Sequence, residues 1–83
     1  MSQRRKLVEA LRNNQRDFGF DDACKVAGWL GFDHSGGKGS HRAFKREGEP
    51  QQLNFQNHEG KIPTYQARQL LVMVDRYWEE QND

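Results

Sequence analysis

The chain has 83 residues, of which 30% are charged and 34% hydrophobic, and its formal net charge is +1 at pH 7. A chain of this length buries only about 60–65% of the surface that its unfolded form exposes, so we expect one small domain with a thin core. These values exclude a second domain, and the near-zero net charge argues against a strongly basic nucleic-acid-binding protein.

Two helices are predicted at the start of the chain. The first spans residues 3–13 and has an apolar face made of Leu7, Val8 and Leu11. The second begins with Asp21 or Asp22 as its N-cap, because a carboxylate can accept the free N–H groups of the first helical turn. Gly31 is placed to end it in the left-handed conformation. Its apolar stripe consists of Ala23, Val26, Ala27 and Leu30.

Three short strands are predicted next. The segment FDHS is the first of them, and GGKG is the turn that follows it. Residues 40–46 and 51–57 alternate with the period of a strand, and Leu53 and Phe55 share one face of the last strand. The link GEPQ between these two segments suits a hairpin connection.

The longest predicted helix follows Pro63 and has Thr64 as its N-cap. Its apolar stripe consists of Ala67, Leu70, Leu71, Val74, Tyr77 and Trp78. The predicted order is therefore α-α-β-β-β-α, which implies an α+β fold with an antiparallel sheet on one side and helices on the other. One face of the sheet is then open to a partner or a substrate.

The glycine-rich stretch GGKGS invites a phosphate-loop interpretation, but its spacing does not fit. A Walker-type loop has a glycine before the lysine, another glycine five residues earlier, and Ser or Thr directly after the lysine at the start of a helix. Here position 32 is Phe32, Gly39 follows Lys38, and a strand follows the loop. We interpret the stretch as a flexible turn, at which glycines would still let an RNA backbone approach closely.

His41 is the candidate for chemistry, although most exposed strand histidines are inert. Strand alternation puts His41 and Lys45 on the open face if Phe44 points toward the helices. Histidine titrates near neutral pH, so it can take a proton from a ribose 2′-hydroxyl or give one to a leaving oxygen. Lys38 and Lys45 could neutralise a phosphate as its charge builds. The residues expected to contact RNA or its phosphates are Lys38, Gly39, Ser40, Arg42, Lys45 and Arg46.

A metal site can be drawn from Asp33, His34, His41 and His58. No pair among them has a recognised ligand spacing such as HExxH, so we expect neither a metal nor another cofactor.

The single cysteine, Cys24, excludes an intramolecular disulfide and fits a reducing compartment. No signal peptide and no apolar stretch of membrane-spanning length is seen, so we expect a cytoplasmic protein with no membrane partner.

The segment GF…KGSHRAFKR resembles the HicA family of toxins from bacterial toxin–antitoxin modules, whose strand motif is close to Gly-Ser-His-His followed by an apolar residue and Phe. Here the motif reads Gly39-Ser40-His41-Arg42-Ala43-Phe44. The segments GWLGF and LNFQNHEGKIPTYQARQLLVMVDRYW also resemble this family, the second in the branch that has an additional N-terminal helix. The resemblance therefore extends over most of the chain.

The resemblance implies one HicA-like domain over residues 1–83, in which residues 1–17 are the additional helix and its connection and residues 18–83 are the core. The fold would be like a double-stranded-RNA-binding domain, with three antiparallel strands packed on helices. The protein would be the toxin of a type II toxin–antitoxin system, a metal-independent endoribonuclease that cleaves mRNA with His41 as its catalytic residue. Its partner would be a HicB-like antitoxin that covers His41, and no direct DNA binding is expected.

The sequence departs from the family pattern at two places. Arg42 stands where the second motif histidine would be, and Arg46-Glu47 replaces the His-Pro that often follows the strand. The catalytic position is intact, but the second proton-transfer group of a histidine pair is missing from the motif. Lys38, Lys45 or a water are the remaining candidates for that role.

Two alternatives stay open on the same fold. One is a non-catalytic RNA-binding module, because RNA duplexes are recognised by shape and phosphate contacts. The other is a protein-interaction module that docks a partner chain on the open sheet face or along a strand edge.

Overall fold

The computed structural model of the chain describes residues 2–79. Its elements follow the predicted order and confirm the α+β fold. They are α1 (Gln3–Asn13), α2 (Phe20–Trp29), β1 (Asp33–Gly36), β2 (His41–Lys45), β3 (Leu53–Gln56) and α3 (Thr64–Tyr77). The bounds of α1 agree with the helix predicted over residues 3–13. The series α2–β1–β2–β3–α3 is the element order expected of a double-stranded-RNA-binding-domain-like core.

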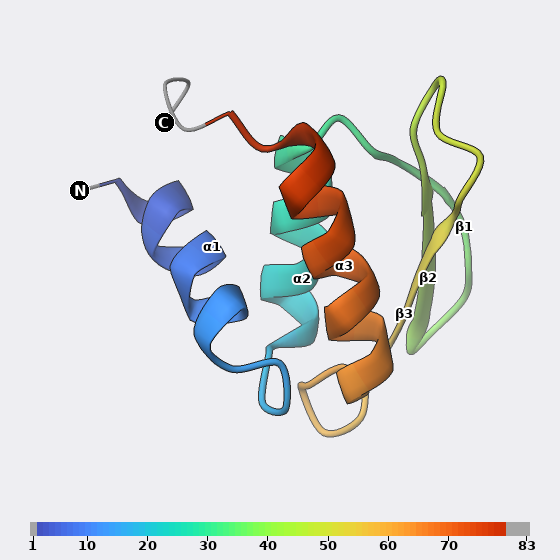
Figure 1. Cartoon of the computed structure of the whole chain (residues 1–83). Helices are drawn as coiled ribbons and strands as arrows, with labels where there is room; N and C mark the ends of the chain where they lie inside the picture. Colours follow the sequence, from blue (N-terminus) through green and yellow to red (C-terminus); the bar gives the residue numbers. More distant parts are fainter. Residues whose placement is uncertain (1, 80–83) are drawn as a thin grey trace.

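The helices all lie on one side of the sheet (Figure 1). The three strands are antiparallel neighbours in the order β1-β2-β3. Helices α2 and α3 cover one face of this sheet, and α1 lies behind them on the side away from the strands. No element within residues 2–79 covers the other face, which we call the open face.

The inner face of the sheet carries the apolar side chains that strand alternation predicts. Phe44 of β2 lies opposite Leu53 of β3. Both side chains are buried, and so is that of Phe55. The rings of Phe44 and Phe55 are 5.6 Å apart between centroids. Burial of one such side chain stabilises the fold by about 1.5–3 kcal/mol. Since residues alternate between faces, His41, Ala43 and Lys45 of β2 point to the open face.

Helix α1 shares the core of the other elements. Its side chains Val8 and Leu11 are fully buried, and they belong to one continuous apolar cluster with α2, α3 and the inner face of the sheet. The cluster also contains Phe18 and Phe20, which flank the connection into α2.

The predicted start of α2 was wrong by about two residues. The N-cap position is Gly19, and Asp21 and Asp22 lie inside the first turn without a side-chain capping bond. The helix starts earlier because the Phe20 side chain is buried and the Phe20 N–H donates to the Gly60 carbonyl at 2.8 Å. The two carboxylates still lie at the helix N-terminus, where the helix dipole favours negative charge.

The predicted end of α2 at Gly31 is confirmed. Gly31 has φ +90°, which is the left-handed region that favours glycine. The Phe32 N–H donates to the Ala27 carbonyl at 3.0 Å and the Gly31 N–H to the Gly28 carbonyl at 3.1 Å, which is the Schellman pattern. This sharp end turns the chain from α2 into β1.

Thr64 is not the N-cap of α3, contrary to the prediction. Pro63 occupies the N-cap position, and Thr64 is the first helical residue. The Pro63 carbonyl accepts hydrogen bonds from the N–H groups of Gln66 and Ala67 at 3.0 and 3.1 Å. The fixed φ of the proline ring therefore sets the start of the helix, and no side-chain cap is made.

Candidate functional site on the open face of the sheet

A tight turn presents His41 at the start of β2. The His41 N–H donates to the Lys38 carbonyl at 3.0 Å, and Gly39 inside this turn has φ +60°. Gly37 has φ +105°, and a Cβ atom there would collide with the backbone carbonyl of His41. The two glycines are therefore required by the turn itself, in agreement with the interpretation of this stretch as a turn.

The His41 side chain lies beside a glutamine and a second histidine. Gln56 is the residue opposite His41 on β3, and its amide nitrogen is 3.0 Å from the Nε2 atom of His41. The amide oxygen of Gln56 is 3.4 Å from the Nε2 atom of His58. Gln56 thus bridges two exposed histidines, one at the start of β2 and one in the turn that follows β3, and we call these three residues the histidine bridge.

His58 is held in place through its backbone. Its N–H donates to the Lys61 carbonyl at 2.7 Å, and the Lys61 N–H donates back to the His58 carbonyl at 3.1 Å. The two residues inside this turn, Glu59 and Gly60, have φ values of +54° and +89°. The left-handed conformation costs Glu59 roughly 1–2 kcal/mol, and the Asn57 side chain supports the turn by accepting from the Gly60 N–H at 2.6 Å.

The strand end that carries Gln56 is tied to α3. The Gln66 side chain is 97% buried, and its amide oxygen accepts from the Gln56 N–H at 2.8 Å. Gln66 thereby satisfies a backbone donor on the outer edge of β3, where no further strand is available. The position of Gln56 on the open face depends on this contact as well as on the pairing with β2.

The two lysines predicted to contact phosphate lie at different distances from His41. Lys38 is exposed in the turn that precedes His41 by three residues. Lys45 is exposed at the far end of β2, roughly 13 Å along the strand from His41. Lys45 also pairs across the sheet with Asp33 of β1. The backbone of Lys38 is therefore next to that of His41, whereas Lys45 lies at the other end of the strand.

The two arginines expected to contact phosphate lie on the helix side of the sheet. The Arg42 guanidinium lies 5.6 Å from the centroid of the Phe20 ring. The Arg46 Nε atom donates to the Leu30 carbonyl at 2.9 Å, and its guanidinium lies 3.9 Å from the Tyr77 ring centroid. Both arginines therefore contact helices, on the side of the sheet opposite His41. Of the expected RNA contacts, the structure brings the turn residues Lys38, Gly39 and Ser40 closest to His41.

The four residues from which a metal site could be drawn are not brought together. His34 lies on the inner side, with its ring 5.6 Å from that of Phe44. Among residues 2–79, no three His, Cys, Asp or Glu side chains converge at one point.

The cysteine is half-buried on α2. Burial raises the pKa of the Cys24 thiol, and this effect outweighs the opposing charge of Arg42. The thiol is therefore protonated at neutral pH, which is unlike a reactive cysteine.

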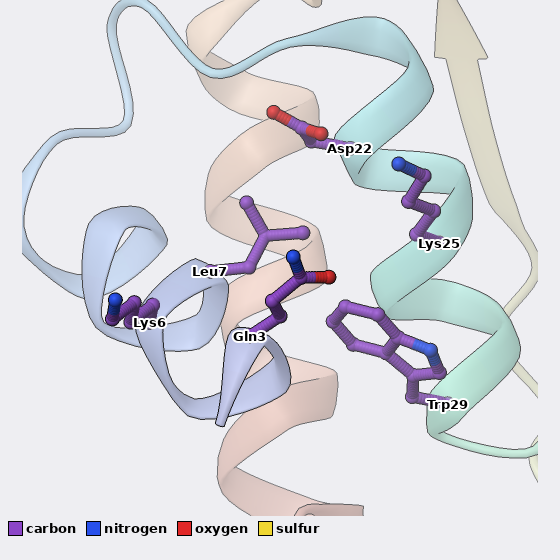
Figure 2. Close-up of a pocket in the computed structure, with 6 residues that line it drawn as sticks. All are labelled: Gln3, Lys6, Leu7, Asp22, Lys25 and Trp29. Atoms are coloured by element: carbon purple, nitrogen blue, oxygen red, sulfur yellow. The ribbon is translucent and has the colours of Figure 1, made fainter. Parts of the chain in front are cut away.

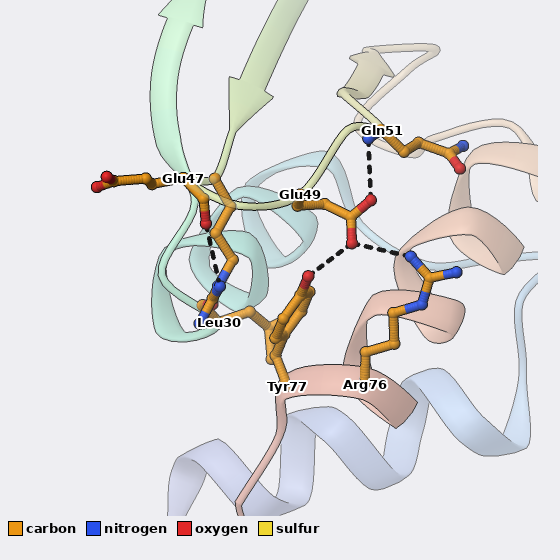
Figure 3. A network of polar contacts seen from close by, with 7 residues as sticks. Leu30, Glu47, Glu49, Gln51, Arg76 and Tyr77 are labelled. Atoms are coloured by element: carbon orange, nitrogen blue, oxygen red, sulfur yellow. Dashed lines mark hydrogen bonds and ion pairs between the residues drawn. The ribbon is translucent and has the colours of Figure 1, made fainter.

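A second polar cluster, centred on Glu49, follows the end of β2 that is opposite His41. Figure 3 shows its contacts. The Glu49 carboxylate accepts from the Tyr77 hydroxyl at 2.6 Å, from Arg76 at 2.8 Å and from the Gln51 N–H at 2.9 Å. Its side chain is only 2% exposed. The hydrogen bond from Tyr77 is the main cause that lowers the pKa of Glu49, and the same bond raises the pKa of Tyr77.

One cavity of about 350 Å³ lies between α1 and α2, away from the sheet (Figure 2). Its lining residues are Gln3, Lys6, Leu7, Asp22, Lys25 and Trp29. Leu7 and Trp29 form apolar walls, and no group suited to proton transfer near neutral pH faces it. A second cavity, of about 380 Å³, is lined by Gly31, Asp33, Arg46 and Glu47, and neither of these two cavities is lined by a histidine.

Gln56 and His58 are the site residues that the sequence analysis missed or passed over. The alternation that turns Leu53 and Phe55 inward also turns Gln56 outward, so its face could have been inferred. That Gln56 lies beside His41 could not be inferred, because this depends on the register between β2 and β3. No local sequence pattern placed His58 near His41.

No family model, no curated protein and no solved structure matches this chain. Within residues 2–79, no helix combines the length and the hydrophobicity that a membrane span requires.

Proposed function

We propose that this protein is an endoribonuclease that cleaves mRNA, the toxin of a HicA-like toxin–antitoxin pair, with His41 as its proton-transfer residue. One observation supports the proposal most: His41 stands exposed on an uncovered sheet face, directly after a glycine turn that carries Lys38. The short motif from Gly39 to Phe44 supports the family assignment.

The proposed reaction uses His41 as a base and the turn before it to stabilise charge. The Nε2 atom of His41 takes the proton of a ribose 2′-hydroxyl, and the 2′-oxygen attacks the adjacent phosphorus. The bond from phosphorus to the 5′-oxygen breaks, and that oxygen takes a proton from an acid or from water. The products are a 2′,3′-cyclic phosphate and a 5′-hydroxyl. Lys38 and the N–H groups of its glycine turn stabilise the charge that builds on the phosphate oxygens.

The same open face would bind the antitoxin. A HicB-like partner that covers His41 would exclude RNA by occupying the site, without any change in the fold of the toxin. The exposed outer strand β1 offers an unpaired edge next to that face, to which a partner could add a strand.

Cleavage by the purified protein tests the proposal. We expect the parent to cut single-stranded RNA and leave 2′,3′-cyclic phosphate ends, and His41→Ala to lower the rate by about 10²–10⁴-fold. His34→Ala is the matched control, because His34 is also an exposed strand histidine but lies on the inner side. Equal cleavage by the parent and by His41→Ala would contradict the role of His41.

Binding without cleavage would support the non-catalytic alternative. In that case the parent and His41→Ala would bind RNA alike, with an affinity that falls as the salt concentration rises. Absence of both cleavage and RNA binding would leave the protein-interaction module.

A further inference from the structure

We propose that His58 is the second proton-transfer group of this site, and that it acts from the opposite side of the Gln56 amide to His41. The inference rests on the proposed function, because it names the group that protonates the leaving 5′-oxygen. The strand motif lacks a second histidine, and the position where it would stand, Arg42, faces the helices. The histidine bridge supplies one from a different part of the chain.

The polarity of the Gln56 amide gives the two histidines opposite roles. An amide nitrogen only donates hydrogen bonds, so the Nε2 atom of His41 at 3.0 Å must accept and carries no proton. An amide oxygen only accepts, so the Nε2 atom of His58 at 3.4 Å must carry one. In this arrangement the Nε2 lone pair of His41 and the Nε2–H group of His58 both face the Gln56 amide.

The spacing of the pair suits a phosphodiester. The two Nε2 atoms are separated by one amide group and two hydrogen bonds. In an in-line displacement the attacking 2′-oxygen and the leaving 5′-oxygen lie on opposite sides of phosphorus, so the base and the acid must also lie on opposite sides. A phosphate that displaces the Gln56 side chain would meet His41 on one side and His58 on the other.

In the proposed step, one proton moves from the RNA to His41 and another moves from His58 to the RNA. His41 accepts the 2′-hydroxyl proton while the bond from the 2′-oxygen to phosphorus forms. The bond from phosphorus to the 5′-oxygen breaks, and that oxygen takes the Nε2 proton of His58 imidazolium. His41 ends protonated and His58 neutral, and exchange with water restores the starting forms. No oxidant, reductant or metal takes part.

Histidine is better suited to this role than the lysines near the site. An imidazolium, with an ordinary pKa near 6.5, gives up its proton to a leaving alkoxide far more readily than an ammonium with an ordinary pKa near 10.4. The backbone of His58 is also fixed by the paired bonds with Lys61, whereas Lys38 lies in a glycine turn on a long side chain. Lys38 keeps the role of a charge near the phosphate.

A substrate with a changed leaving group tests the assignment. The cleavage position is first mapped with the parent, and an RNA is then made with sulfur in place of the 5′-bridging oxygen at that position. A thiolate leaves without protonation, so this substrate needs a base but no acid. We expect His58→Ala to slow the cleavage of ordinary RNA by about 10²–10⁴-fold and to recover most of the lost rate on the sulfur substrate. His41→Ala should stay slow on both, and His34→Ala should match the parent.

The outcomes separate this inference from the proposed function. If the parent cuts neither substrate, the proposed function is wrong and the role of His58 falls with it. If His41→Ala is inactive but His58→Ala cuts ordinary RNA like the parent, the function stands and this inference is wrong. If His58→Ala is slow on both substrates, His58 acts on structure and not as the acid. Should His58→Ala fail to fold, judged by its circular dichroism, His58→Gln replaces it, since it keeps a polar side chain but has no group that titrates near neutral pH.

Discussion

Strand β2 connects two polar clusters that differ in almost every physical respect. It begins at His41, in the histidine bridge, whose two imidazoles are exposed. Directly after it, Arg46 packs on Tyr77, which donates to the 2% exposed carboxylate of Glu49. The first cluster has the exposure that a reaction with RNA requires, and the second has the burial that stabilises a fold. One short strand therefore joins the proposed site to a cluster of mutually paired polar side chains.

The number of hydrogen bonds in a polar cluster does not by itself indicate a functional site. The Glu49 cluster has more and shorter hydrogen bonds than the histidine bridge. Its groups are paired with one another around the Glu49 carboxylate, although the Arg76 side chain is half-exposed. Substitutions in the two clusters should consequently affect different measurements, activity for one and stability for the other.

The largest effect on stability is expected for Glu49→Ala. It removes the acceptor of three hydrogen bonds and leaves Tyr77, Arg76 and the Gln51 N–H without their partner. We expect the melting temperature to fall by at least several degrees, while the RNA-cleavage rate of the folded fraction stays that of the parent. Thermal unfolding and cleavage assays on the same preparation measure both. A variant that melts like the parent but loses cleavage would reverse the roles assigned to the two clusters.

A smaller effect is expected for Gly37→Ala, with Gly36→Ala as its matched control. Alanine at position 37 would have φ +105° and would strike the His41 carbonyl, whereas a Cβ atom at position 36 meets nothing within 4 Å. We expect Gly37→Ala to destabilise the protein by more than about 1 kcal/mol and Gly36→Ala to change stability by less than about 0.5 kcal/mol. Urea unfolding of both variants measures the difference. Equal stabilities would show that the turn before His41 relaxes freely.

The smallest effect is expected for Tyr77→Phe, which keeps the ring beside Arg46 but removes the hydroxyl from Glu49. That hydroxyl is the main cause of the lowered pKa of Glu49. A lowered carboxyl pKa stabilises the fold above the ordinary value of about 4.3 and loses this effect as the pH falls through the folded-state value. The raised pKa of Tyr77 stabilises the fold below about pH 10 and loses this effect as the pH rises further.

The parent and Tyr77→Phe should therefore differ most in melting temperature around neutral pH. The difference should shrink below about pH 4 and again above about pH 10. Melting curves collected from pH 3 to pH 11 check this, and a constant difference across that range would show that the hydroxyl does not act through Glu49.

The features of the site that depend on a single strand or turn could be predicted from the sequence. The strand period gave the outward direction of His41 and the inward direction of Phe44, and both are confirmed by burial. The turn at Gly37 and Gly39 followed from the conformational freedom of glycine. The N-caps of α2 and α3 were predicted wrongly, because contacts of Phe20 with a distant loop and the rigid ring of Pro63 outweighed side-chain capping preference.

By itself the sequence determined the element order, the apolar face of each element and the exposure of His41, because each of these depends on local periodicity or on the backbone preference of one residue. Only the tertiary structure decided which side chains meet. The β2–β3 register puts Gln56 beside His41, and a closed turn brings His58 to the other end of the same amide. The two side-chain partners of Glu49, Arg76 and Tyr77, likewise come from 27 and 28 residues further along the chain. Such pairings depend on how the whole chain packs, and no local pattern encodes them.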